Sequence, residues 1–168
     1  NSFGQAIVGY FVLLGNLGIT IYGAKAIAER RDDKNSKQQK FAECVTYQFF
    51  FNLIAILLYN SWVIFQGDYI YFLFNIIILT SMTDLSWAYT GMERFDLIAV
   101  RNLVIKIVGT LLIFLFVKQQ EDLSLFIIIQ QGVLLISNVV FWFELDKLEI
   151  VPRFSSLTLS LKNIFKPA

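Results

Sequence analysis

Charged side chains inside long apolar runs are the groups in this sequence best placed to do chemistry. Asp84, Arg101 and Lys106 each lie inside such a run, while Glu93 and Arg94 occupy the short polar turn between two runs. A charge at the centre of a bilayer costs about 2.5–3.5 kcal/mol on insertion scales, so such residues usually face a protein interior or a wet cavity. We therefore take these residues as the centre of a candidate site within a membrane.

The residue types that are absent or rare exclude most catalytic chemistry. The 168 residues contain no histidine and a single cysteine, Cys44. Histidine is the commonest general base and metal ligand, and one thiol forms neither a metal cluster nor a disulfide framework. We therefore expect no enzymatic activity and no cofactor.

Amide side chains recur at helical spacing in the same apolar runs. Asn102, Lys106 and Thr110 follow one another at intervals of four, which places them on one face of a helix. Polar stripes of this kind serve as packing contacts between membrane helices, and they also line polar paths through a membrane. Both roles agree with the sequence. The amides that we add to the candidate site are Asn16, Gln48, Asn52 and Asn102.

The apolar runs themselves predict membrane-spanning helices. Apolar residues make up 57% of the chain and charged residues only 16%, a composition on the membrane side of ordinary soluble domains. A membrane helix needs about 20 mostly apolar residues. The sequence therefore predicts an all-α membrane protein, a polytopic bundle of five transmembrane helices within residues 1–143. The five predicted spans are Ala6–Ala28, Phe41–Phe65, Tyr69–Tyr89, Leu97–Val117 and Leu123–Phe143.

The positions of Lys and Arg predict how these spans are oriented. If the first span ends inside the cell, every one of the 14 Lys and Arg residues except Lys118 falls on the inner side. Cytoplasmic loops of membrane proteins carry such an excess of positive charge. We therefore expect loops 29–40 and 90–96 and the tail 144–168 to be cytoplasmic.

The turn that contains Glu93 and Arg94 predicts a partner for Asp84. Because this turn is short, the third and fourth spans are expected to be antiparallel neighbours, and Arg101 and Lys106 on the fourth span become candidate partners for the Asp84 carboxylate. Trp87 and Tyr89, near the inner end of the third span, are typical of the aromatic belt at a membrane interface.

The tail that follows the fifth span has a pattern of its own. Leu157, Leu161, Ile164 and Phe165 recur at spacings of three and four, which is typical of an amphipathic helix on a membrane surface. We therefore interpret residues 144–168 as a cytoplasmic amphipathic linker that leads toward a further span. A plain linker fits the same residues.

Three motifs carry a resemblance to a known family. They are "YFVLLGNLGITIYGAKAIAERRDDK" over residues 10–34, "DLSWAYTGMERF" over residues 84–95 and "LKNIFKPA" over residues 161–168. Together with their order and spacing, they resemble the bacterial polysaccharide repeat-unit flippases for O-antigen, capsule and exopolysaccharide. These belong to the multidrug/oligosaccharidyl-lipid/polysaccharide exporter superfamily. The resemblance extends over residues 3–168.

The resemblance implies a function and a set of partners. It implies that the five spans match helices two to six, a partial N-terminal lobe of a transporter with 12–14 helices, whose remainder would be a partner of this piece. The cargo would be an undecaprenyl-diphosphate-linked oligosaccharide, moved from the inner to the outer leaflet of the bacterial inner membrane. Arg and Lys would bind the diphosphate, and Asn and Gln the sugars. Coupling to H⁺ or Na⁺ would involve Asp84 or Glu93. No nucleic acid is expected as a partner.

Three alternatives stay open beside this prediction. Another exporter of the same superfamily would move a lipid-linked peptidoglycan precursor or a drug. A repeat-unit polymerase would want a large polar outer loop, whereas the outer turns here are short. A structural membrane protein would use every polar stripe only to pack helices.

Overall fold

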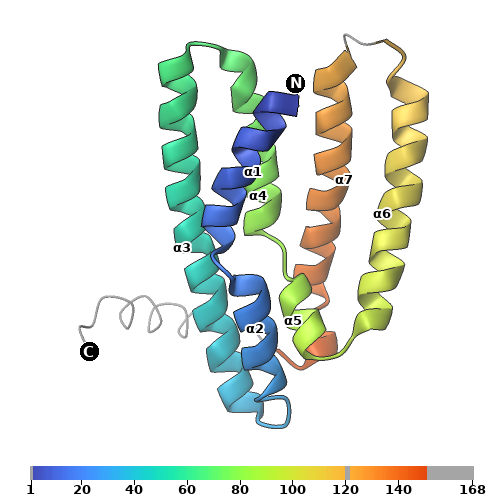
Figure 1. The fold of residues 1–168 in the computed structure, drawn as a ribbon. Helices are drawn as coiled ribbons and strands as arrows, with labels where there is room; N and C mark the ends of the chain where they lie inside the picture. Colours follow the sequence, from blue (N-terminus) through green and yellow to red (C-terminus); the bar gives the residue numbers. More distant parts are fainter. Residues whose placement is uncertain (1, 120–121, 151–168) are drawn as a thin grey trace.

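All regular structure in the described part of the chain is helical. The computed structural model describes residues 2–119 and 122–150 and forms no strand there. Within those ranges, five helical segments are long and apolar enough to cross a membrane, judged by length and composition, and they run alongside one another (Figure 1). The predicted all-α class and the predicted number of apolar helical segments are therefore confirmed. The five segments are Phe3–Ala28, Lys34–Gln66, Tyr69–Gly91, Phe95–Phe116 and Ser124–Phe143.

The second segment is one continuous helix, α3 (Lys34–Gln66), which is longer than predicted at its start. The Asp33 carboxylate caps its first turn by accepting hydrogen bonds from the backbone N–H groups of Asn35 and Ser36 at 3.0 and 3.2 Å. Such a cap satisfies N–H groups that have no partner within the helix, so the polar residues before Phe41 are also helical. The helix ends at Gln66, and the capping residue Gly67 has a φ of 74°, the left-handed conformation that glycine adopts readily.

The first segment contains a break that the sequence analysis did not predict. It consists of α1 (Ser2–Asn16) and α2 (Ile19–Ala28), with Leu17 at φ 27° and Gly18 at φ 75° between them. These values lie outside the right-handed helical region, so the chain changes direction there. The predicted continuous helix over Ala6–Ala28 is therefore wrong at residues 17 and 18.

The third segment is broken as well. It begins with a 3₁₀ helix, η1 (Tyr69–Phe74), and continues as α4 (Asn75–Met82) and α5 (Ser86–Gly91). Residues 83–85 are not helical, so the predicted continuous helix over Tyr69–Tyr89 is wrong there too. The predicted turn after this segment is present, and α5 ends at Gly91.

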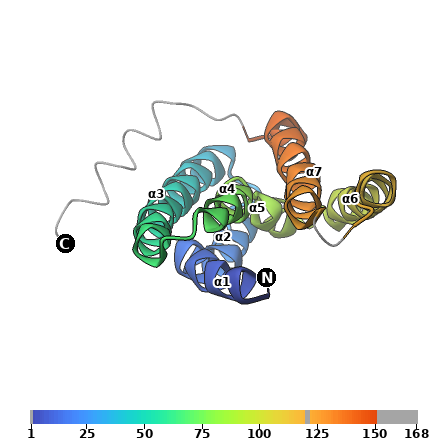
Figure 2. The ribbon, with the colours of Figure 1, turned by 90° about the horizontal axis from the view of Figure 1, so that it is seen from above.

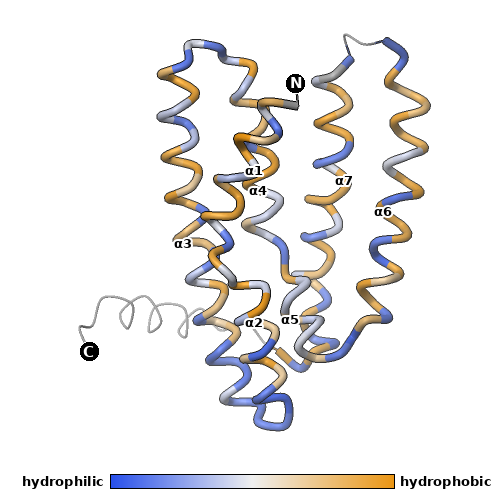
Figure 3. Tube along the Cα trace, in the orientation of Figure 1, coloured by the Kyte–Doolittle hydropathy of each residue, from blue (hydrophilic) through white to orange (hydrophobic). Residues whose placement is uncertain are grey.

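The last two segments are the continuous helices α6 (Phe95–Phe116) and α7 (Leu123–Phe143), which pack against each other. Seen from above, α6 is the outermost helix and has α7 between it and most of the bundle (Figure 2). The turn between α5 and α6 and the loop between α2 and α3 lie at the same end of the bundle (Figure 1). The α2–α3 loop is the most hydrophilic part of that end (Figure 3).

The segment after α7 folds back onto the bundle. It forms the 3₁₀ helix η3 (Leu145–Leu148), and Leu145, Leu148 and Ile150 are buried among residues of α2, α3 and α5. Residues 144–150 are therefore part of the packed bundle and not a surface linker, which corrects the predicted division at residue 143. The predicted amphipathic pattern at Leu157–Phe165 lies outside the described residues.

Two apolar cores hold the bundle together. One core, which includes Val8, Tyr59 and Ile78, joins α1, α3 and α4 near the end where η1 lies. The other joins α2, α3, α5 and α7, and it includes Trp87 and Tyr89. Both aromatic side chains are buried, at 3% and 0% exposure, so their predicted place in an interfacial belt is wrong.

Candidate functional site

A layer of polar side chains separates the two apolar cores at the height of the helix breaks. On α3, for example, Val45 belongs to one core and Ala55 to the other, and Gln48 and Asn52 lie between them. Every one of the five apolar segments contributes to this layer. Its members are Asn16, Gln48, Asn52, Thr80, Ser81, Asp84, Ser86, Arg101, Ser137 and Asn138.

Gln48 holds the break between α4 and α5. Its side-chain nitrogen donates to the carbonyl oxygens of Ser81 and Asp84, both at 2.9 Å, and its side-chain oxygen accepts from the indole N–H of Trp87 at 2.9 Å. Gln48 is only 2% exposed. Because a broken helix leaves carbonyl groups without helical partners, a buried amide at this position supplies the missing hydrogen bonds.

Asn52 and Asn16 bring the other break next to this one. The Asn52 side-chain nitrogen donates to the carbonyl oxygen of Gly15 at 3.1 Å, in the last turn of α1. The Ser81 hydroxyl donates to the side-chain oxygen of Asn16 at 3.1 Å. The two breaks therefore lie side by side, joined through polar side chains.

Helix α7 completes the hydrogen bonding of the α4–α5 break. The Asn138 side-chain nitrogen donates to the carbonyl oxygen of Thr80 at 2.7 Å, and the Trp142 indole N–H donates to the carbonyl oxygen of Thr83 at 2.9 Å. The carbonyl groups at the end of α4 thus receive partners from α3 on one side and α7 on the other. Non-helical backbone at membrane depth requires such partners.

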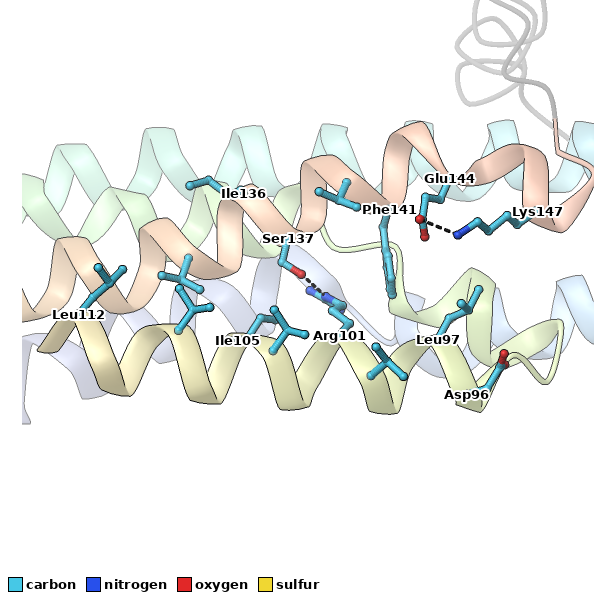
Figure 4. Close-up of a pocket in the computed structure, with 15 residues that line it drawn as sticks. Asp96, Leu97, Arg101, Ile105, Leu112, Ile136, Ser137, Phe141, Glu144 and Lys147 are labelled. Carbon is cyan, nitrogen blue, oxygen red and sulfur yellow. Dashed lines mark hydrogen bonds and ion pairs between the residues drawn. The ribbon is translucent and has the colours of Figure 1, made fainter. Parts of the chain in front are cut away.

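Arg101 brings a positive charge to the edge of the polar layer. Its side chain is 9% exposed and points from α6 toward α7 (Figure 4). The guanidinium donates to the Ser137 hydroxyl at 2.8 Å, to the Ser86 hydroxyl at 2.7 Å and to the Asn138 side-chain oxygen. It also lies over the Phe141 ring, 4.5 Å from the ring centroid, in a cation–π contact.

Asp84 pairs with Arg101 mainly through a shared neighbour. The Asp84 carboxylate lies 3.6 Å from the guanidinium, whereas it accepts from the Ser86 hydroxyl at 2.5 Å and from the Ser86 N–H at 3.0 Å. The predicted partnership of Asp84 with Arg101 is therefore confirmed. Lys106, the other predicted partner, is exposed on α6 and forms no ion pair with any described residue.

Two hollows meet at Arg101. One is a pocket of about 280 Å³ beside the helix breaks, whose polar lining includes Asn16, Ser81, Asp84 and Asn138. The other is a largely apolar groove of about 550 Å³ between α6 and α7, which lies along the helices shown in Figure 4. Arg101 lines both. The Arg101 cation thus lies between a small hollow with several polar side chains and a larger, largely apolar groove.

Four of the residues predicted for the site lie away from it. Glu93 is exposed and pairs with Arg31 at 2.9 Å, and this hydrogen-bonded contact lowers the pKa of the Glu93 carboxyl. Arg94 pairs with the neighbouring Asp96 at 3.0 Å. The other two predicted residues are Asn102 and Lys106, which are exposed on α6.

Several members of the site were not predicted from the sequence. Ser86 follows Asp84 by two residues, the spacing at which an Asp side chain accepts from the backbone, and this spacing was the available signal. Ser137 and Asn138 are polar residues in the apolar run of α7. Which of the polar residues on α7 face Arg101 depends on how α6 and α7 pack.

Comparison with family models, with curated proteins and with solved structures finds no match to this chain. A function for this chain is therefore inferred from its own residues and their contacts. The resemblance of its motifs to polysaccharide flippases stays a prediction.

Proposed function

We propose that this chain is part of a membrane transporter that moves an undecaprenyl-diphosphate-linked oligosaccharide across the bacterial inner membrane. The observation that supports this most is the position of Arg101 between a polar pocket and an apolar groove. A lipid-linked sugar diphosphate has a polar head, an anionic centre and a long apolar chain. The site offers a matching surface to each of these three parts.

The surroundings of Arg101 suit a phosphate group. Guanidinium groups bind phosphates through paired, charge-assisted hydrogen bonds, and such contacts strengthen away from bulk water. The Asp84 carboxylate lies 3.6 Å from Arg101, beyond ordinary hydrogen-bond distance. An incoming diphosphate therefore replaces hydrogen bonds to Ser86 and Ser137 and does not have to break a tight ion pair.

The two helix breaks supply a way to move. Helices α2 and α5, which follow the breaks, pack closely because Gly23 lies against Trp87 and Gly91 lies against Ala24 and Ile27. In this proposal α2 and α5 rock together about the adjacent breaks and open the site toward the cytoplasm. Broken helices at a midplane site and rocking of helix groups are features of secondary transporters.

In this proposal Asp84 is the residue that binds the coupling ion. Of the two acids considered for coupling, Asp84 lies in the site and its side chain is 45% exposed. Glu93 lies outside the site in an exposed ion pair with Arg31. A proton or Na⁺ that binds at Asp84 would neutralise the negative charge beside Arg101 and so remove its repulsion of an anionic cargo.

One observation favours a purely structural alternative. Gln48 and Asn138 use their side-chain groups to satisfy backbone carbonyls and neighbouring side chains, which is the role of packing contacts between helices. If the whole polar layer serves only this purpose, Arg101 stabilises the bundle and binds no cargo.

Substitution of the site residues in the full-length protein separates the two functions. We expect Arg101→Gln and Asp84→Asn to reduce surface polysaccharide while the amount of protein in the membrane stays the same. Lys118→Gln, on the exposed turn between α6 and α7, is the control and should change neither quantity. Loss of the protein itself would support the structural role, and unchanged polysaccharide with normal protein would contradict the proposed transport.

A further inference from the structure

Helix α6 has a polar face that no described residue covers. Asn102, Lys106 and Thr110 lie on it at intervals of four, and all three are exposed. Lys106 is at the middle of the helix, about 15 Å from either end at 1.5 Å per residue. If α6 crosses a membrane, the Cα atom of Lys106 lies near the middle of the span.

This polar face is distinct from the candidate site. Arg101, Val108 and Leu112 line the groove toward α7. At 3.6 residues per turn, Lys106 is rotated by about 140° from Arg101 around the helix axis. Helix α6 is the outermost helix and packs on α7 (Figure 2). Because the residues of the polar face are exposed, this face is directed away from the bundle.

The described part of the chain offers no free carboxylate at the depth of Lys106. The five apolar segments contain three acidic residues, and each of them already has a basic partner within 4.0 Å. A second copy of this bundle would therefore bring no unpaired acid to Lys106. The three pairs are Glu43 with Lys40, Asp84 with Arg101, and Asp96 with Arg94.

The shape of the face suits another helix. Ala99, Gly109 and Thr110 are small residues on the same side as Lys106, and a Cβ atom added to Gly109 would meet nothing within 4 Å. Small residues let two membrane helices approach closely, and polar residues among them form contacts across the interface. The neighbouring Leu103 and Ile113 are apolar, so the polar stripe is narrow and not the broad wall of a water-filled path.

We propose that a further transmembrane helix docks on this face of α6 and carries an aspartate or glutamate that pairs with Lys106. An unpaired cation at mid-membrane requires a counter-charge or water, and the small residues around Lys106 fit a helix. This interface does not depend on the proposed cargo, because it includes neither Arg101 nor either hollow.

Substitutions of Lys106 in the full-length protein by a neutral and by an acidic residue test whether an acidic side chain faces it. We expect Lys106→Met to be present in the membrane at a moderately reduced amount, because the partner carboxylate loses its counter-charge but can become neutral by taking up a proton. We expect Lys106→Glu to be depleted severalfold, because two carboxylates would then face each other. Lys118→Glu is the control charge reversal, two residues beyond the end of α6, and should have no effect. Equal amounts of the Met and Glu variants would overturn the proposal.

Chemical labelling tests whether a helix or water covers the face. Lys106→Cys should not react with a membrane-impermeant maleimide, whereas Lys118→Cys should react. The native Cys44 is buried, so the unsubstituted protein gives the background. Labelling at position 106 would show a water-filled path instead. A genetic selection tests the pairing itself. Second-site mutations that restore the amount of the Lys106→Glu variant should replace an acid in another membrane helix by Lys or Arg. If a saturating search for such mutations returns no charge reversal of this kind, the pairing is overturned.

Discussion

Ser81 and Asn16 join the two helix breaks by a side-chain hydrogen bond of 3.1 Å, although they are 65 residues apart in the sequence. Each residue lies close to the point where its helix ends, Asn16 at the end of α1 and Ser81 near the end of α4. The breaks therefore belong to one polar layer and are joined directly within it.

Gln48→Leu should destabilise the bundle strongly. The substitution keeps the side chain about the same size but leaves the carbonyl of Asp84 without its donor and the indole N–H of Trp87 without its acceptor. Each buried polar group left unpaired costs about 1–3 kcal/mol. Thermal unfolding of the purified protein in detergent should show a clear drop in midpoint. Gln39→Leu, at an exposed position of the same helix, is the control and should leave the midpoint nearly unchanged.

Gly91→Ala should loosen the packing between α2 and α5. A Cβ atom at this position would lie 2.5 Å from the carbonyl oxygen of Ala24, so the backbone of one helix must shift. Overpacking of this kind costs about 1–3 kcal/mol. Gly9→Ala is the matched control, because its Cβ would meet nothing within 4 Å, and it should be neutral or slightly stabilising. If both variants unfold at the same temperature, the close approach of α2 and α5 is not needed for stability.

The Arg31–Glu93 pair should make stability depend on pH in the acidic range. Its hydrogen bond from Arg31 lowers the pKa of the Glu93 carboxyl below that of the unfolded chain. A group with a lowered pKa stabilises the fold above its unfolded pKa, and this contribution disappears as pH falls through the folded pKa. The difference in unfolding midpoint between the natural protein and Glu93→Gln should therefore shrink from neutral to acidic buffer. Because the pair is exposed, high salt should also reduce the difference.

Arg101→Lys should weaken anion binding although it keeps the positive charge. Lysine has one compact ammonium group and cannot reproduce the separate hydrogen bonds of the guanidinium to Ser86, Ser137 and Asn138. We expect the affinity of the full-length protein for undecaprenyl diphosphate to fall roughly tenfold, which corresponds to about 1.4 kcal/mol. Arg30→Lys is the control and should bind normally. Equal affinities of the two variants would argue against a diphosphate at Arg101.

The sequence predicted the helical segments well because their apolar length is a property of many residues together. It did not predict the breaks, because each depends on the conformation of two or three residues inside an apolar run. Gly18 is an ordinary packing residue by composition, and only its φ of 75° marks the end of α1. The third segment likewise carries no proline at residues 83–85 that would have signalled a break.

The candidate site was predicted in part for a related reason. The short turn after α5 makes α5 and α6 neighbours, and this was enough to place Asp84 near the basic residues of α6. The choice between Arg101 and Lys106 depends on how α6 is rotated about its axis, which its packing against α7 determines. Trp87 and Tyr89 were predicted to lie at a membrane interface because their hydrogen-bond partners could not be predicted. These partners are Gln48 and Phe141, which come from distant parts of the chain.

The hydrogen bonds from α7 to the α4–α5 break have a consequence for how the chain assembles. The carbonyl groups of Thr80 and Thr83 receive their donors from Asn138 and Trp142, which are synthesised 58 and 59 residues later. Until α7 has packed against the break, the carbonyl of Thr83 lacks this donor and the carbonyl of Thr80 keeps only the hydroxyl of Thr83, at 3.1 Å. The break therefore becomes fully hydrogen-bonded late in biogenesis, and we expect a chain truncated before α7 to hold it less rigidly.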